Sequence, residues 1–170
     1  MIVRKATRVD LLGIGQIAVA AHWASYEGLL RLDTIGQLLM RDFSPGALGR
    51  RLLRGGVFVA ATRDEIVGFA DGDVRSEAVH VSALATEPSM RRRGVGTALL
   101  TAVRGLSPDS PVAADVLLGN LEGEQFYEVN GFVPGEIQHG SLFAEDVVER
   151  RWWREAMVET QPGWRVASRG

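Results

Sequence analysis

Six consecutive residues of this chain, Arg91-Arg92-Arg93-Gly94-Val95-Gly96, have the types and spacing suited to holding a phosphate group. They follow an apolar run that ends near Thr86, and they lead into a run of helical periodicity that begins at Val95. The first N–H groups of a helix have no carbonyl partners and carry partial positive charge, so they attract anions. The arginines add charge, and the glycines allow the backbone to approach a bulky pyrophosphate. The segment therefore predicts a binding site for a phosphate-bearing ligand.

Two familiar phosphate motifs do not fit this segment. It lacks the G-x-x-x-x-G-K-[ST] pattern of a P-loop. It contains G-x-G, but Leu99 occupies the position where a dinucleotide fingerprint has its third glycine or an alanine. A nucleotide-binding module that uses Arg91–Gly96 for another anion is therefore the weakest of the functional hypotheses.

A second motif lies about thirty residues downstream, where Asn120 to Phe132 reads N-x(5)-F-Y-x-x-x-G-F. Together with the R-x-x-G-x-G pattern that starts at Arg91, it resembles the GCN5-related N-acetyltransferases, the GNAT family. The resemblance implies an α+β fold with a single domain over about residues 2–153. Its mixed, mostly antiparallel central sheet would have about six to seven strands flanked by helices, in the order β-α-α-β-β-β-α-β-α-β-β.

Hydrophobic periodicity and turn residues predict the same order of elements. Strands are expected at 2–6, 57–62, 65–71, 78–86, 112–118, 132–133 and 147–153. Helices are expected at 11–26, 32–40, 95–106 and 121–129, with one more short helix at 48–53 after a loop at Pro45-Gly46. Asp10 and Asn120 are suited to capping helices, and Arg63-Asp64 to a hairpin turn.

The resemblance implies that acetyl-CoA is the cosubstrate and that no metal takes part. Backbone amides around Arg91–Thr97 would bind its pyrophosphate, and the preceding strand would pair with the pantetheine arm and polarise the thioester carbonyl. The same strand reads equally well as an ordinary core strand. The residues expected to bind the cofactor are Leu84, Ala85, Thr86, Arg91, Arg92, Arg93, Gly94, Val95, Gly96, Thr97, Asn120 and Phe126.

Acyl transfer to an amine requires a base for the amine and an acid for the leaving thiolate. Tyr127 stands where the family places its general acid, although a packed aromatic residue is the alternative. His80 lies eleven residues before Arg91, at the spacing where some family members carry a catalytic glutamate. An imidazole suits this duty near neutral pH, and the alternative is that His80 is an ordinary hydrogen-bonded polar residue of the strand. Asp71, Asp73 and Glu77 compete for the role of base.

The acceptor site has weaker signals. Trp23 and Tyr26 are similar to a segment that walls the acceptor site in one GNAT subgroup, although this spacing is also common in a helical core. Asp71 and Asp73 would attract a cationic substrate, although solvated loop charges are the more common role for such residues. No code for an acceptor is recognisable in 29–56 or 139–146. The arginines outside the phosphate loop are expected on solvated faces: Arg50, Arg51, Arg54, Arg150, Arg151 and Arg154.

Composition fits one globular domain at 1–155, followed by a tail or loosely packed extension at 156–170. The 170 residues have a net charge of −2 and no cysteine, which argues against nucleic acid, disulfides and thiolate chemistry. No apolar run approaches a membrane span, so a cytoplasmic protein is expected. Alternation along Trp152-Trp153 directs one ring inward and one outward, and the outer ring suits a homodimer contact or the tail.

Two functions remain. The first is an acetyl-CoA-dependent N-acetyltransferase, which acts on a primary amine of a small molecule or peptide by direct attack in a ternary complex. The second is a non-catalytic acyl-CoA-binding or sensing protein on the same fold. Tyr127 favours the enzyme, because a protein that only binds acyl-CoA needs no hydroxyl at the sulfur.

Overall fold

A computed structural model describes residues 1–63 and 65–156 of the chain. Its strands are β1 (Ile2–Lys5), β2 (Val57–Ala61), β3 (Ile66–Val74), β4 (Val79–Thr86), β5 (Val112–Leu117), β6 (Val133–Leu142) and β7 (Glu145–Arg154). Its α-helices are α1 (Leu11–Tyr26), α2 (Leu32–Phe43), α3 (Pro45–Arg54), α4 (Val95–Arg104) and α5 (Leu121–Val129). Two short 3-10 helices, η1 (Arg8–Asp10) and η2 (Pro88–Met90), precede α1 and the phosphate loop.

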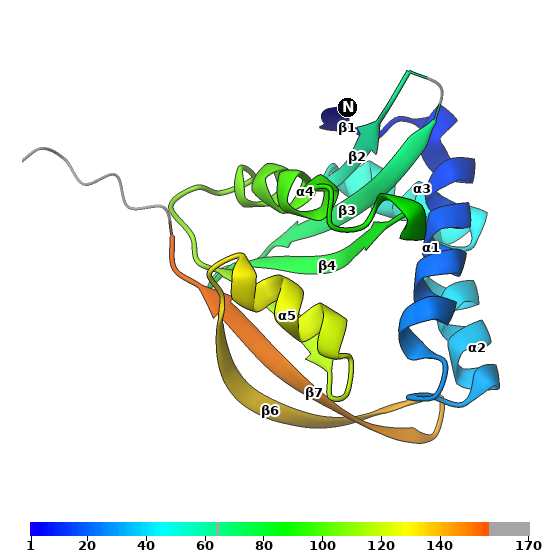
Figure 1. Cartoon of the computed structure of the whole chain (residues 1–170), viewed down its shortest axis with the longest axis vertical. Coiled ribbons are helices and arrows are strands. Elements are labelled where there is room, and N and C mark those ends of the chain that lie inside the picture. The colour runs from blue at the N-terminus through cyan, green and yellow to red at the C-terminus, as the bar shows by residue number, and fades with distance from the viewer. Residues whose placement is uncertain (64, 157–170) are drawn as a thin grey trace, which may run out of the picture.

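The seven strands form one sheet in the order β1-β2-β3-β4-β5-β7-β6 (Figure 1). All neighbouring strands pair antiparallel except β4 and β5, which run parallel. The predicted α+β fold with its mostly antiparallel central sheet is therefore confirmed.

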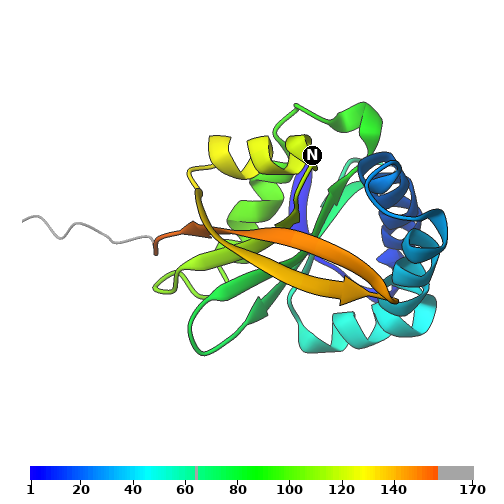
Figure 2. The ribbon, with the colours of Figure 1, turned by 90° about the horizontal axis from the view of Figure 1, so that it is seen from below.

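Helices cover both faces of this sheet. Figure 2 shows α1, α2 and α3 gathered on one side of the sheet and α4 and α5 on the other. Each side has its own apolar core. Ile14, Ile35 and Phe69 are fully buried in the core under α1–α3, whereas Leu99 and Val103 of α4 are buried in the second core. Because alternate strand residues point to opposite faces, neighbouring residues of one strand contribute to different cores.

The parallel β4–β5 pair is short, and the opening beyond its end marks the position of the candidate site. Strand β4 pairs with β5 only from Val79 to Val81, although β4 continues to Thr86 and β5 to Leu117. A register shift between β3 and β4 at Asp71/Gly72 places one extra residue in β4 just beyond the last pair. The far halves of β4 and β5 therefore separate, and among residues 1–63 and 65–156 no strand pairs with that edge of the far half of β4. We call this opening the β4–β5 split.

Helix α3 is longer than the sequence pattern predicts. The expected loop at Pro45-Gly46 is instead the first turn of the helix, and the Ser44 hydroxyl accepts a hydrogen bond from Ala47 N at 3.4 Å. Proline is tolerated at this position because the N–H groups of a first turn need no intrahelical partner. Gly55 ends the helix in the left-handed conformation, with φ +83°.

The β6–β7 hairpin is the largest difference from the expected elements. A strand was expected only at 132–133, but β6 extends over ten residues, and most of its side chains are exposed. An exposed edge strand needs no apolar alternation, so hydrophobic periodicity does not reveal it. Its turn contains Phe143 (φ +48°) and Ala144 (φ +63°) instead of the glycine or asparagine typical of such turns.

Some predictions concern residues outside the described ranges. The expected hairpin between β2 and β3 is confirmed by their pairing, although its turn includes residue 64. The expected tail at 156–170 lies outside the described residues except for residue 156. Within the described ranges, no helix has both the length and the apolar character needed to cross a membrane.

Candidate active site

A groove of about 420 Å³ opens beside the β4–β5 split. It is lined by the C-terminal part of α1, the far half of β4, the phosphate loop, the first turn of α4 and one face of α5 along its whole length. Of the residues predicted to bind a cofactor, all but Arg93 line it: Leu84, Ala85, Thr86, Arg91, Arg92, Gly94, Val95, Gly96, Thr97, Asn120 and Phe126. The sequence did not single out Ala21 and Ser25 of α1, which form the opposite wall.

The start of α4 presents backbone donors to this groove. The N–H of Ala98 donates to Gly94 O at 3.0 Å, which is the first backbone bond of the helix. The N–H groups of Val95, Gly96 and Thr97 precede it and have no carbonyl within the helix to reach. Gly94 has φ +79° and open space where a Cβ would stand. This arrangement can bind a pyrophosphate through amides and a helix dipole.

Gly96 has a different function from Gly94. A Cβ at Gly96 would lie 2.8 Å from the Phe126 ring and 3.6 Å from Leu84. The missing side chain thus allows α4 to approach α5 and β4 closely. Asn120 caps α5 as predicted, because its Oδ1 accepts a hydrogen bond from Gly123 N at 3.1 Å.

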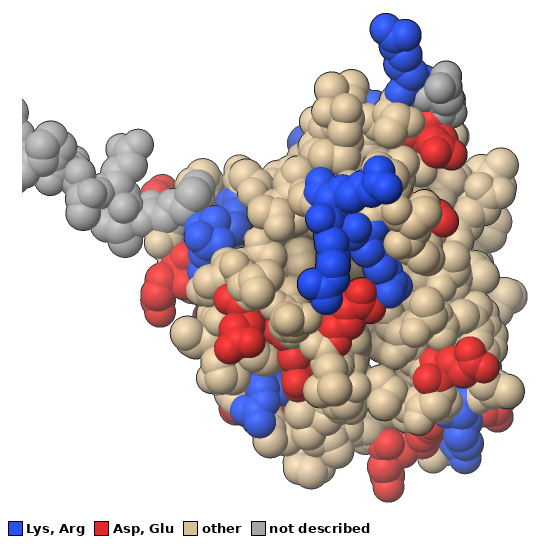
Figure 3. Space-filling model, in the orientation of Figure 1, with Lys and Arg blue, Asp and Glu red and all other residues tan. Residues whose placement is uncertain are grey.

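The arginines of the loop contact the helix across the groove. Arg91 forms an ion pair with Glu122 at 2.7 Å, and Arg92 contacts Gln125 Oε1 at 3.4 Å. Figure 3 shows basic side chains gathered on this face with acidic side chains directly beside them. Glu122 and Gln125 line the groove, although the sequence did not single them out. The charge at the groove is therefore partly neutralised by α5.

Tyr127 lies behind the groove wall. Its ring packs between Phe126 and Phe132, with centroid distances of 5.1 and 5.0 Å, and only 8% of the residue is exposed. Burial, with smaller contributions from Tyr26 and Asp115, holds the pKa of Tyr127 above its usual range. The phenol therefore stays protonated at neutral pH and is a weaker acid than an exposed tyrosine, and its ring is also part of the core.

His80 and Asp73 lie opposite each other on β4 and β3, on the same side of the sheet as α1. His80 is half-buried. Its pKa is lowered, chiefly by burial and then by the charges of Arg75 and Arg151. The imidazole is therefore neutral near pH 7. Asp73 is engaged by Arg75 at 3.0 Å. The competing Glu77 is exposed in the loop between these strands.

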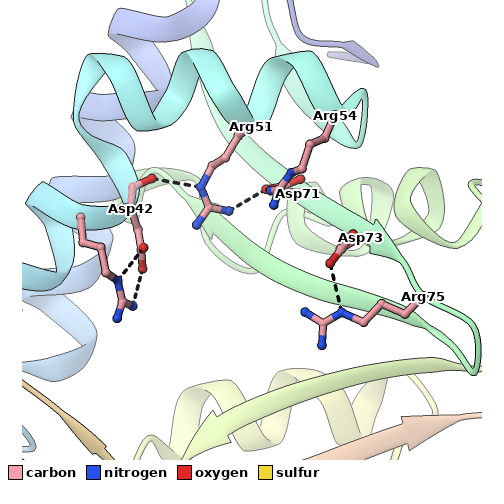
Figure 4. A network of polar contacts seen from close by, with 7 residues as sticks. Asp42, Arg51, Arg54, Asp71, Asp73 and Arg75 are labelled. Carbon is pink, nitrogen blue, oxygen red and sulfur yellow. Dashed lines mark hydrogen bonds and ion pairs between the residues drawn. The ribbon is translucent and has the colours of Figure 1, made fainter.

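Asp71 does not reach the groove. It is fully buried, and its Oδ2 accepts hydrogen bonds from Arg51 at 2.6 Å and Arg54 at 2.8 Å (Figure 4). Arg51 also donates to Asp42 O at 3.0 Å. The expectation that Arg51 and Arg54 only cover a solvated face is corrected here, since both fasten α3 to the sheet. Asp71 is therefore enclosed by its own chain.

Trp23 and Tyr26 are both half-buried against the core under α1. Burial and the nearby Glu149 hold the pKa of Tyr26 above its usual range. Of the adjacent tryptophans in β7, Trp152 is buried, whereas Trp153 is half-buried and donates its Nε1 hydrogen to Glu136 at 3.2 Å. Arg151, expected on a solvated face, instead donates two hydrogen bonds to Asp115, at 2.8 and 2.9 Å.

Comparison with solved structures finds many similar folds. PaiA N-acetyltransferase from Thermoplasma acidophilum, in complex with coenzyme A, matches at a TM-score of 0.74 and 18% identity, over 88% of this chain and 96% of that one. A GCN5-related N-acetyltransferase from Rhodopseudomonas palustris matches at 0.76 and 18%, over 91% and 94%. Ribosomal-protein-alanine N-acetyltransferase from Brucella melitensis matches at 0.64 and 19%, over 91% and 99%.

Comparison by sequence identifies the family of this chain. Among curated proteins, none matches this chain. The profile of the acetyltransferase (GNAT) domain matches residues 48–134, which include β4, the phosphate loop, α4 and the Asn120–Phe132 motif. This match covers half of the chain and contains both motifs, so the protein belongs to the GNAT acetyltransferase family.

Proposed function

We propose that the protein is an acetyl-CoA-dependent N-acetyltransferase, which transfers the acetyl group to a primary amine by direct attack in a ternary complex. The observation that carries this proposal is the groove itself, in which the amides at the start of α4 and the unpaired edge of β4 face one space. The structure of a neighbour with bound coenzyme A supports the choice of ligand.

Each wall of the groove would hold one part of the cosubstrate. The amides of Val95, Gly96 and Thr97 would bind the pyrophosphate. The free edge of β4 would hydrogen-bond the pantetheine arm as an added strand does, and an amide in the Leu84–Thr86 segment would polarise the thioester carbonyl. Acetyl-CoA supplies the activated acyl group when bound.

Proton transfers are assigned to Tyr127 and His80. We propose that Tyr127 donates a proton to the leaving sulfur, because it stands in the second motif and its phenol is protonated at neutral pH. The raised pKa of Tyr127 opposes this role, since it makes the phenol a weaker acid. We propose that His80 accepts the amine proton through water, because β4 places it near the closed end of the split and its imidazole is neutral at pH 7. Trp23, Tyr26 and Asp73 are proposed to border the acceptor.

A second candidate is a non-catalytic acyl-CoA-binding protein. The packing of Tyr127 between two phenylalanines favours it, because a core residue needs no catalytic role to explain its position. The two candidates share the groove and differ in whether an amide product forms.

Ligand binding tests the groove assignment. Thermal unfolding would be measured with CoA, ATP and NAD at equal concentrations. A ligand present at one hundred times its Kd stabilises the folded state by about 2.7 kcal/mol, so CoA should raise Tm clearly. Stabilisation by ATP or NAD without stabilisation by CoA would overturn the assignment.

A further inference from the structure

Glu149 occupies a position that neither motif explains. It lies in the middle of β7 and pairs in register with Leu117, the last residue of β5. The side chains of Val147 and Leu117 belong to the core under α1, and alternation places Glu149 on that same face. Its side chain therefore points to the side of the sheet opposite α4 and α5.

Strand register brings Glu149 level with the proposed thioester site. The last β4–β5 pair joins Val81 to Ala114. Allowing for the one extra residue in β4, three further steps bring Ala85 level with Leu117. Because Leu117 pairs with Glu149, the carboxylate lies at the level of the Leu84–Thr86 segment, one strand beyond the split. His80 pairs with Ala113, nearer the closed end of the split.

The Glu149 carboxylate is half-buried without a partner. Within residues 1–63 and 65–156, it forms no hydrogen bond and no ion pair. The other carboxylates of this area are occupied. Glu145 accepts two hydrogen bonds from Arg31 N, at 2.7 and 3.0 Å, and Asp115 is held by Arg151. A carboxylate that loses solvent without gaining a partner is costly, so the position suits a cationic ligand.

The surroundings of Glu149 would sharpen its preference for a cation. Burial and the nearby Asp115 raise the pKa of Glu149, whereas Arg151 opposes this shift. The guanidinium of Arg151 already donates both of its short hydrogen bonds to Asp115. Tyr26 on α1 lies close enough for the Glu149 charge to raise its pKa. A positive group beside Glu149 would relieve repulsion between the two carboxylates.

The connection between α1 and α2 closes this area at its outer end. Arg31 ties it to Glu145 at the start of β7. Leu29 reaches the loop after β5, where a Cβ at Gly119 would lie 3.0 Å from its Cδ2. A ligand at Glu149 would therefore lie between this connection and the split.

We infer that Glu149 is the acceptor-binding carboxylate of the enzyme, which holds a primary amine in its cationic form at the level of the thioester until the amine proton passes through water to His80, and which selects against amines that carry a carboxylate on the neighbouring carbon. This inference rests on the proposed function. A second negative charge would lie against Glu149 and Asp115 with no unoccupied cation to receive it among the neighbours named above.

The first experiment measures acceptor class in the wild-type protein. Initial rates of CoA release would be measured with 1,3-diaminopropane and a tripeptide amide, and compared with glycine and alanine at equal concentration and pH. The cationic amines without an adjacent carboxylate should be the better acceptors. Preference for glycine or alanine would overturn the inference and leave the proposed function standing. Failure to bind acetyl-CoA, or binding without acetylation of any of the four amines, would overturn the proposed function.

The second experiment tests Glu149 directly with the better cationic probe. Glu149→Gln should raise the acceptor KM about ten- to a hundredfold, as expected for one lost charged hydrogen bond, and leave the acetyl-CoA KM within about twofold. Asp146→Asn removes the same charge from an exposed site of the same strand and serves as the control. Glu149→Asp should restore part of the affinity. Equal acceptor KM values for Glu149→Gln and Asp146→Asn would overturn the inference, provided that both variants keep the wild-type Tm.

Discussion

The two sides of the β4–β5 split present different chemical groups: backbone groups on one side and side chains on the other. On the α4–α5 side, the groove offers backbone groups: the first amides of α4 and the free edge of β4. On the α1 side, side chains come from elements far apart in the chain: His80 from the closed end of the split, Glu149 from β7 at the level of its open part, and Tyr26 of α1 near Glu149. Under the proposed function, the backbone groups would recognise what all acyl-CoA molecules share. Side chains can change without altering the fold, so they are suited to choosing an acceptor.

The largest effect is expected at the backbone side. Gly94→Glu places a carboxylate beside the amides of α4 and should weaken CoA binding about a thousandfold through repulsion of the pyrophosphate. Gly55→Glu is a matched control, because Gly55 also has positive φ and open space but lies at the end of α3. Both variants carry the same backbone strain, so calorimetric titration with CoA isolates the site. Equal Kd values for CoA in the two variants would disprove the assignment of the α4 amides to the pyrophosphate.

Tyr127→Phe tests whether the buried Tyr127 hydroxyl, behind the groove wall, takes part in the chemistry. The variant keeps the packing against Phe126 and Phe132, so acetyl-CoA should bind with unchanged Kd. Loss of a general acid should lower kcat about a hundredfold. Pre-steady-state rates would establish that chemistry limits turnover. An unchanged rate of the chemical step would leave Tyr127 as a packing residue and favour the non-catalytic candidate.

His80 should have a smaller effect, visible mainly in the pH profile. The pKa of His80 is lowered, so the acid limb of kcat/KM should lie below the ordinary histidine value of about 6.5. The value of kcat/KM should fall as pH decreases through the lowered pKa of His80, because the imidazole then becomes protonated and cannot accept the amine proton. His80→Ala and His80→Gln should both remove this limb. Identical profiles in wild type and both variants would transfer the role of base to another residue.

The smallest effect on activity is expected from Asp71, whose function is structural. Asp71→Asn leaves two arginines without their carboxylate and should lower the free energy of unfolding by about 3 kcal/mol. Asp73→Asn, on the same strand, breaks only a partly exposed pair and should cost less than about 1 kcal/mol. Urea unfolding would measure both. If Asp71→Asn abolished turnover without loss of stability, Asp71 would belong to the catalytic site.

The same contrast explains what the sequence could predict. The cofactor side is encoded in two contiguous segments, so Arg91–Gly96 and Asn120–Phe132 locate the groove without a structure. Glu149 becomes notable only through its pairing with Leu117, which depends on the β5–β7 register. The burial of Asp71 depends likewise on Arg51 and Arg54 of α3, seventeen to twenty residues away. The β6 strand lacked both alternation and a glycine turn, so no local pattern could predict its length.

The central claim is that the groove and the acceptor side together transfer an acetyl group to an amine. Wild-type protein would be incubated with acetyl-CoA carrying a ¹³C-labelled acetyl group and with 1,3-diaminopropane, and the products would be identified by mass spectrometry. The account predicts an N-acetylated amine carrying the label, formed together with free CoA in equal amounts. Binding of acetyl-CoA without any labelled amide, or release of CoA with free acetate as the only labelled product, would contradict it.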